Sequence, residues 1–279
     1  MLYLLLAIAS SALVSIVMRF SERKVTGSIA MLTVNYLVCA AISGGYLLAD
    51  PLPASPQLPA TLLMGTVNGL LYLGGFVLLQ ISIQRNGVVL SSTFMKLGLL
   101  VSILVSVVCF HEIPDVLQIL GFFLAVAAIL LINFKRTSGA ADFKAGLLLL
   151  LLTGGMGDAM AKVFEELGDP ALEPLFLFCT FLTALILCTA LMLRKHQRPG
   201  KWELLFGVLI SIPNFFSAKF LLGALKDIAA VVVYPVYSVA TILTVTVTGV
   251  LVFREKLDKR QWLALAMILV ALVLLNVSV

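Results

Sequence analysis

The sequence has 279 residues, of which 61% are hydrophobic and 12% are charged, and its mean hydropathy is +1.13. These values exclude a soluble globular protein and indicate a polytopic membrane protein. The formal net charge of +5 does not indicate a nucleic-acid partner, because the basic residues are scattered over many short loops. The lipid bilayer is therefore the expected surrounding of most of the chain.

Ten apolar runs follow one another, each close to the roughly 20 residues that a helix needs to cross a hydrocarbon core of about 30 Å. In chain order, we expect membrane-spanning helices at about 2–20, 28–49, 59–82, 87–109, 114–134, 143–163, 171–193, 202–224, 228–252 and 259–278. The connections between them are too short for a separate soluble domain. We therefore predict an all-α polytopic membrane protein with ten transmembrane helices.

The chain matches itself without a gap at an offset of 143 residues, which carries Val88 onto Val231. The same offset pairs Phe110 with Phe253, Glu112 with Glu255, Asp115 with Asp258, Gln118 with Gln261 and Asn133 with Asn276. Each copy holds an odd number of predicted spans, so the two copies must be inverted relative to each other in the membrane. We predict a first five-helix repeat at 1–137 and a second, inverted repeat at 143–279.

The basic residues also predict an orientation. Nearly all Lys and Arg residues outside the spans lie in the connections from odd to even spans, whereas Lys162 and Lys226 lie on the other side. Since cytoplasmic loops are enriched in Lys and Arg, we expect both termini outside, in a multi-pass protein of the cell (plasma) membrane. The basic connection at 194–201 corresponds to the connection at 50–59, which has no Lys or Arg, as inversion requires.

Each copy ends with an apolar span, a glutamate, a short polar turn and a Gln that opens the last span. These motifs are Phe110-His111-Glu112-Ile113-Pro114-Asp115 with Gln118, and Phe253-Arg254-Glu255-Lys256-Leu257-Asp258 with Gln261. Together with the ten spans and the repeat, they resemble the EamA-like branch of the drug/metabolite transporter superfamily along essentially the whole chain. Pro235 matches that family's proline near the start of the penultimate span, although the first copy has Ser92 there. The resemblance implies a secondary transporter with both termini in the cytoplasm, opposite to the charge-based orientation.

Lys96 lies near the middle of the predicted span 87–109, roughly 14 Å or more from either end by helical rise. A lysine side chain is too short to reach the membrane surface from there, so we expect a polar or water-filled surrounding. The favoured interpretation is that Lys96 binds an anionic group of the substrate. The alternative is a neutral lysine, or one bonded to helix carbonyls or to Asp158.

Asp158 and Lys219 each lie about five residues from the non-basic end of their predicted spans, at similar depth, where an ion pair is possible. Asp158 is a candidate substrate or proton site, although Lys162 stands one turn later on the same helix face. Lys219 is a candidate substrate ligand, or a lysine that extends to the membrane surface.

Polar and aromatic residues on the predicted inner faces complete the candidate substrate site. They are Asn35, Asn68, Tyr72, Asn214, Tyr234 and Tyr237. Hydrogen bonding between helices is the alternative role for such polar groups. Glu112 and Glu255 recur in both copies near span ends, so we expect helix caps or turn formers there rather than proton carriers.

The leading functional hypothesis is transport of a small anionic or zwitterionic metabolite, such as an amino acid or organic acid, by alternating access, with export favoured. No nucleotide-binding loop is present in the sequence, so a proton or a counter-substrate is the expected coupling partner. A lipid-linked substrate flippase or a multidrug exporter would share the fold. No cofactor, metal site or catalytic residue is expected, and the chain is expected to be a monomer or a homodimer.

An intramembrane aspartyl protease is a remote alternative, because Gly155-Met156-Gly157-Asp158 resembles the Gly-x-Gly-Asp signature of that class. Such chemistry needs two carboxylates that share a proton, and no second Asp or Glu lies deep in a predicted span. Pro170-Ala171-Leu172 echoes the second signature but falls in a predicted loop. We therefore predict that the chain is not an enzyme.

Overall fold

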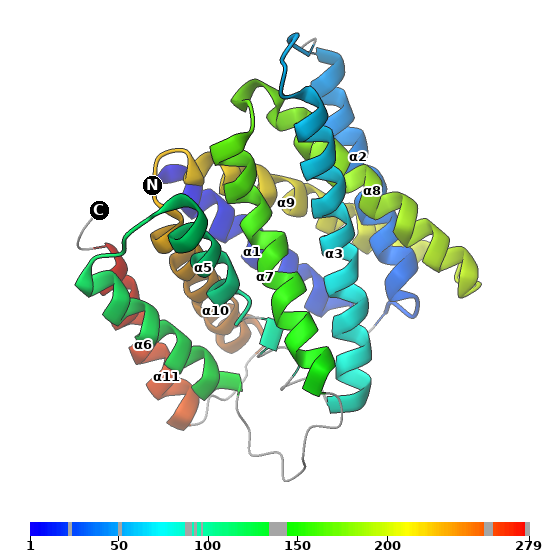
Figure 1. Cartoon of the computed structure of the whole chain (residues 1–279). Helices are drawn as coiled ribbons and strands as arrows, with labels where there is room; N and C mark the ends of the chain where they lie inside the picture. The colour runs from blue at the N-terminus through cyan, green and yellow to red at the C-terminus, as the bar shows by residue number, and fades with distance from the viewer. Residues whose placement is uncertain are drawn as a thin grey trace. The chain divides into compact units, whose positions relative to one another are not determined.

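The computed structural model describes residues 1–21, 24–49, 52–86, 91, 94–95, 97–133, 144–253 and 259–276. Within these ranges the fold is all-helical, which confirms the predicted fold class (Figure 1). In chain order the helices are α1 (Leu2–Ser21), α2 (Ser28–Ala49), α3 (Leu58–Asn86), α5 (Leu99–Phe110), α6 (Val116–Asn133), α7 (Lys144–Leu167), the 3-10 helix η1 (Pro170–Leu172), α8 (Glu173–Arg194), α9 (Lys201–Leu225), α10 (Ala230–Phe253) and α11 (Lys259–Asn276).

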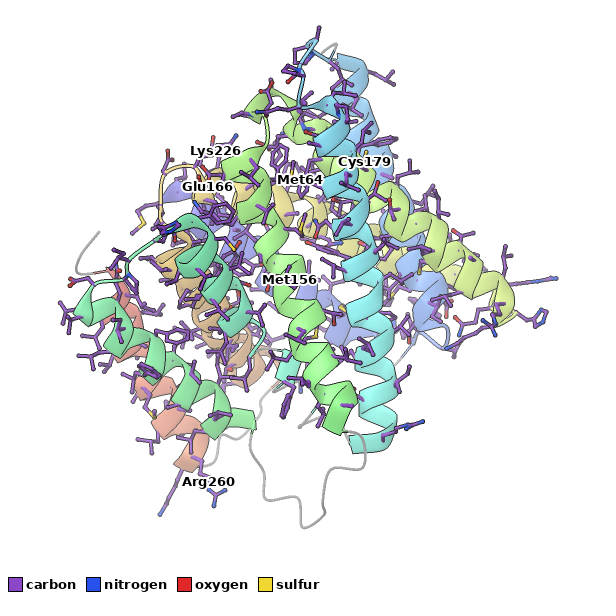
Figure 2. The ribbon with its side chains drawn as sticks, in the orientation of Figure 1. Met64, Met156, Glu166, Cys179, Lys226 and Arg260 are labelled. Atoms are coloured by element: carbon purple, nitrogen blue, oxygen red, sulfur yellow. The ribbon has the colours of Figure 1, made fainter. Side chains whose placement is uncertain are left out.

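Length and composition suit these helices to a membrane. Among the described residues, seven helices are long and apolar enough to cross one, and α5, α6 and α11 contain shorter apolar stretches. Only internal hydrogen bonding satisfies a backbone inside lipid, so even runs rich in Val and Ile become helical. Large apolar side chains on the outer faces, such as Leu63, Ile186 and Leu251, are more than half exposed, and Figure 2 shows such side chains pointing outwards. These faces are suited to contact lipid.

The prediction of one continuous helix over 87–109 is wrong. Leu97 and Gly98 form a turn, and α5 begins at Leu99. The Gly98 amide donates to the Met95 carbonyl, three residues back, at 3.1 Å. A Cβ atom added to Gly98 would lie 2.8 Å from the backbone nitrogen of Gly155 in α7, so at this turn the two backbones approach too closely for a side chain.

The chain packs as two compact units. The first unit comprises Met1, 74–162 and 224–279, and the second unit comprises 2–73 and 163–223. The offset of 143 residues relates α2 to α8 and α6 to α11. Each unit therefore contains equivalent helices from both copies of the repeat.

In the second unit, α2 packs antiparallel to its equivalent α8. Near the start of α2, the Thr33 hydroxyl donates to the sulfur of Cys188, near the end of α8, at 3.4 Å. At the opposite ends, a Cβ atom added to Gly44 would lie 3.2 Å from the Phe178 ring. Two equivalent helices that run in opposite directions are what an inverted repeat requires.

In the first unit, α6 packs antiparallel to its equivalent α11, and Figure 1 shows the two side by side. Gly121, near the start of α6, contacts Leu275, near the end of α11, and an added Cβ atom would lie 2.9 Å from that side chain. Fully buried Ala128, Ile129 and Ile268 belong to the core of this unit. Small residues at the crossing allow the two backbones to approach closely.

Candidate functional site

The predicted site residues are divided between the two units. The first unit contains Asp158, Tyr234 and Tyr237, and the second contains Asn35, Asn68, Tyr72, Asn214 and Lys219. Lys96 lies outside the described residues, and so does Glu255. Each unit is therefore described by its own contacts.

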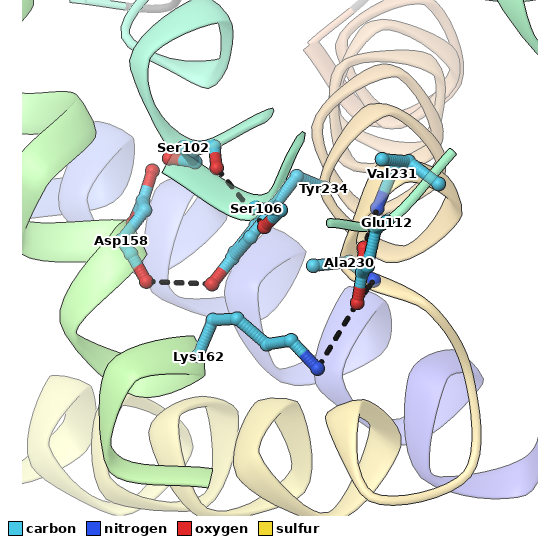
Figure 3. Close-up of polar contacts among 8 residues, drawn as sticks. All are labelled: Ser102, Ser106, Glu112, Asp158, Lys162, Ala230, Val231 and Tyr234. Carbon is cyan, nitrogen blue, oxygen red and sulfur yellow. Dashed lines mark hydrogen bonds and ion pairs between the residues drawn. The ribbon is translucent and has the colours of Figure 1, made fainter. Parts of the chain in front are cut away.

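In the first unit, Tyr234 of α10 and Asp158 of α7 lie together (Figure 3). The Tyr234 hydroxyl donates to the backbone carbonyl oxygen of Asp158 at 2.8 Å. Tyr234 is almost fully buried and Asp158 is half-buried. A buried tyrosine hydroxyl needs a hydrogen-bond partner, so this bond holds the Tyr234 ring next to Asp158.

One turn away, Glu112 connects three helices (Figure 3). Its carboxylate, just after α5, lies 3.0 Å from the ammonium of Lys162 on α7. The same carboxylate accepts hydrogen bonds from the amides of Ala230 at 3.1 Å and Val231 at 3.0 Å, in the first turn of α10. Glu112 therefore caps a helix, as expected. The helix that it caps is α10, not α5, which it follows in the chain, and its carboxylate also forms an ion pair with Lys162.

These contacts join α7 to α10 at two successive turns. Lys162 follows Asp158 by four residues on α7, and Tyr234 follows Ala230 by four residues on α10, one helical turn in each case. The buried hydroxyl of Ser102 on α5 donates to the Gly155 carbonyl at 2.9 Å and so adds a third contact on α7. We refer to Ser102, Glu112, Asp158, Lys162 and Tyr234 as the α5–α7–α10 cluster.

Further along α10, Tyr237 is half-buried and Thr241 is buried. The Thr241 hydroxyl has no hydrogen-bond partner among the described residues. An unsatisfied buried hydroxyl costs free energy, so this position is suited to a polar group of a bound molecule or to a water.

In the second unit, Lys219 of α9 lies against an aromatic residue of α2. Its ammonium is 3.7 Å from the centroid of the Tyr46 ring, which stacks on Phe215 with centroids 5.9 Å apart. The negative face of an aromatic ring attracts a cation. Tyr46 was missed from the sequence, although it stands eleven residues after Asn35, close to three helical turns, and so shares its face.

Asn35 and Asn214 connect α2 and α9 in the same unit. The Asn214 side-chain amide reaches the Asn35 side-chain oxygen at 3.4 Å and the Cys39 sulfur at 3.9 Å. Asn35 is fully buried and Asn214 is half-buried. These contacts match the alternative interpretation, hydrogen bonding between helices, and they leave part of Asn214 accessible.

Asn68 and Tyr72 lie one turn apart on α3. The Asn68 amide donates to the Thr180 hydroxyl of α8 at 3.3 Å, while its side-chain oxygen is buried without a hydrogen-bond partner among the described residues. Tyr72 is half-buried. The bond between Asn68 and Thr180 is again a contact between helices.

Glu203, in the first turn of α9, has a buried side chain and was not among the predicted site residues. One of its oxygens accepts hydrogen bonds from the amides of Thr26 at 3.0 Å and Gly27 at 3.2 Å, just before α2, and from the Thr26 hydroxyl at 3.3 Å. The other oxygen accepts from the Gly200 amide at 3.1 Å. The sequence did offer a signal for this residue, because Glu203 is an acidic residue at the start of the predicted span 202–224.

The four cysteines are free, with Cys39, Cys179 and Cys188 buried and Cys109 exposed. Among the residues that the structure describes, no group of three or more His, Cys, Asp or Glu side chains is placed to hold a metal ion.

Comparisons with known proteins agree with this architecture. A family model described as "EamA-like transporter family" matches the chain twice, at 1–134 and 145–277. A protein of Haemophilus influenzae, described as "Uncharacterized protein", is 27% identical over 277 residues, covering 94% of this chain and 93% of that protein. A solved structure described as "Crystal structure of protein" covers 99% of this chain and 96% of its own at 14% identity, with a TM-score of 0.77, and this likeness concerns the fold alone.

Proposed function

The chain belongs to the EamA-like transporter family, and on that premise we propose that it moves a small anionic or zwitterionic metabolite by alternating access. The family consists of multi-pass membrane transporters, so the chain is a transporter and not an enzyme. The Gly-x-Gly-Asp resemblance at Asp158 therefore carries no proteolytic function. Amino acids and organic acids are the substrate classes proposed, with export as the favoured direction.

One observation carries the choice of substrate: the Lys219 ammonium lies on the face of the Tyr46 ring and is half-buried in the unit. An aromatic ring attracts a cation but does not neutralise it, so the positive charge remains available to an anionic group. A cation inside a membrane protein is costly and is commonly part of a substrate or ion pathway. Tyr46 is 36% exposed, so its ring, which stacks on the fully buried ring of Phe215, also offers an apolar surface for the body of a metabolite.

Lys96 and Asp158 extend the proposal. The sequence places Lys96 deep in a span, where we propose that it binds an anionic group. We also propose Asp158, whose backbone carbonyl is bound by Tyr234, as a substrate or proton site.

The experiment is a thermal-shift screen of the purified full-length protein against a panel of amino acids, organic acids and lipid-linked sugars, because a bound metabolite raises the melting temperature. Compounds that bind are then tested for counterflow in proteoliposomes. Lys219→Met should abolish the shift. Lys24→Met is the matched control and should keep the shift. The Lys24 ammonium also lies over an aromatic ring, 3.9 Å from the centroid of the Trp202 ring, but just before the N-terminal end of α2.

Unchanged transport of every anion and zwitterion in both Lys219→Met and Lys96→Ala would overturn the proposed substrate class. A shift with lipid-linked sugars alone would favour the flippase alternative. For the orientation, we propose that both termini lie outside, as the basic connections indicate. A reporter that is active only in the cytoplasm should be silent when it is fused after Val279, and its activity there would reverse this orientation.

A further inference from the structure

The ion pair between Glu112 and Lys162 is more buried than its place near span ends leads one to expect. The Lys162 side chain is 5% exposed and that of Glu112 is 14% exposed. Removing two charges from water is costly, and an ion pair offsets this cost only with good geometry and further hydrogen bonds. Such a pair therefore calls for a physical role beyond a simple surface contact.

The further hydrogen bonds come from the first turn of α10. Lys162 and the Ala230 amide both contact Oε1 of Glu112, and the Val231 amide contacts Oε2. The first amides of a helix have no acceptor within the helix, and the positive end of the helix dipole favours a carboxylate. Lys162 therefore holds the carboxylate in an orientation in which both oxygens face α10.

The next turn contains the candidate substrate contacts. Tyr234 follows Ala230 by one turn, and its hydroxyl donates to the backbone carbonyl of Asp158, one turn before Lys162 (Figure 3). The ion pair and the tyrosine bond thus connect the same two helices at adjacent levels. If the first turn of α10 moves, the ring of Tyr234 moves with it.

We propose that Glu112 and Lys162 are positioning residues that hold the first turn of α10 and thereby fix Tyr234 beside Asp158. Neither residue needs to touch the transported molecule. The inference rests on the proposed function only in taking Tyr234 and Asp158 as substrate contacts. The positioning itself is measurable without a substrate.

The first test is hydrogen–deuterium exchange of the full-length protein in lipid nanodiscs. In Lys162→Gln, the amides of Ala230 and Val231 should exchange about tenfold faster or more, because their acceptor is no longer held in place. Lys162→Arg keeps the charge and should restore slow exchange. Exchange as slow in Lys162→Gln as in the unmodified protein would overturn the proposal, as would an arginine variant as fast as the glutamine variant.

The matched control is Glu203→Gln, which alters a buried carboxylate that accepts backbone amides in the second unit. It should accelerate the exchange of Thr26 and Gly27 and leave the first turn of α10 unchanged. Acceleration of Val231 in this control would show that exchange reports general loosening and would overturn the assignment.

The second test follows Tyr234 itself through nitration by tetranitromethane, with peptide mass spectrometry to locate the modified ring. Tyr234 is 2% exposed and Tyr36, in the second unit, is 6% exposed. Lys162→Gln should increase the nitration of Tyr234 severalfold while Tyr36 stays unreacted. Tyr234 that stays equally protected would contradict the positioning role.

A double variant, Glu112→Gln with Lys162→Gln, separates positioning from stability. It leaves no uncompensated buried charge, so it should fold even where the single variants do not. Amide exchange at Ala230 and Val231 and nitration of Tyr234 should stay elevated, because the charged acceptor of the α10 amides is gone. If both returned to the values of the unmodified protein, the ion pair would only add stability and the proposal would be overturned. None of these tests uses a substrate. The proposed function can therefore be wrong while the positioning role is right, and the positioning role can be wrong while the proposed function is right.

Discussion

Each compact unit contains a glutamate whose carboxylate accepts backbone amides at or just before the start of another helix, and the two glutamates differ in the charge of their partners. In the first unit, Glu112 receives two amides of α10 together with the ammonium of Lys162. In the second unit, Glu203 receives amides and the Thr26 hydroxyl, which are neutral donors. Both carboxylates accept backbone amides. In the first unit, a substitution of either Glu112 or Lys162 removes a charge from the contact, whereas in the contact of the second unit only Glu203, among the described residues, carries a charge.

The two lysines of these units differ in the same sense. Lys162 lies against a carboxylate, whereas Lys219 lies against an aromatic ring. An ion pair compensates a charge, and a cation–π contact leaves it available to a further anion. This difference is the reason why we propose a structural role for Lys162 and substrate binding for Lys219.

The largest effect is expected for Lys162→Met, which leaves the Glu112 carboxylate without its counter-charge. We expect a loss of about 3–5 kcal/mol in the free energy of unfolding, because an uncompensated buried carboxylate is costly. Thermal unfolding followed by fluorescence-detected size exclusion measures it. A melting temperature equal to that of the unmodified protein would show that the pair is not needed for stability.

Glu203→Ala should have the next largest effect. It removes the acceptor of the Thr26 and Gly27 amides, which we expect to cost about 1–3 kcal/mol. The loss should be smaller than for Lys162→Met, because no charged partner is left buried. The same unfolding assay compares the two variants directly, and a larger loss for Glu203→Ala would reverse the order that the structure implies.

Tyr46→Leu tests the aromatic partner of Lys219. Loss of the cation–π contact should cost about 0.5–2 kcal/mol and weaken binding of any metabolite found in the thermal-shift screen. Tyr46→Phe keeps the ring and should behave like the unmodified protein. If the leucine and phenylalanine variants had the same stability and bound the metabolite equally well, the Tyr46 ring would not be part of the binding site.

Thr26→Ala should have the smallest effect. It deletes one hydroxyl donor to Glu203 at 3.3 Å and keeps the amide bonds, so we expect a loss of about 0.5–1 kcal/mol. If its melting temperature fell as far as that of Glu203→Ala, the hydroxyl rather than the backbone would be the main partner of that carboxylate.

Much of the fold could be predicted because membranes constrain sequences strongly. The match of α2 to α8 and of α6 to α11 followed from the offset of 143 residues, and antiparallel contacts such as Gly121 with Leu275 agree with the predicted inversion. The turn before α5 was not predicted; it lies where Gly98 approaches Gly155 of α7, and periodicity along a single segment does not reveal such a contact.

The site was predicted less completely. Asp158 and Tyr234 were chosen separately and lie together, whereas Asn35 and Asn214 bond to each other across two helices. Glu112 was expected to cap a helix, but neither the helix that it caps nor its lysine partner could be read from the chain. Tyr46 could have been found from its spacing to Asn35.

The membrane class, the duplication, the inversion and the family could be predicted from the sequence, because hydrophobic length, loop charge and repeated residues are visible along the chain. The partners of the charged side chains became visible only in the folded structure. It pairs Lys162 with Glu112 and places Lys219 on Tyr46. Such partners lie on separate helices, and their choice depends on how those helices pack, which no single segment specifies.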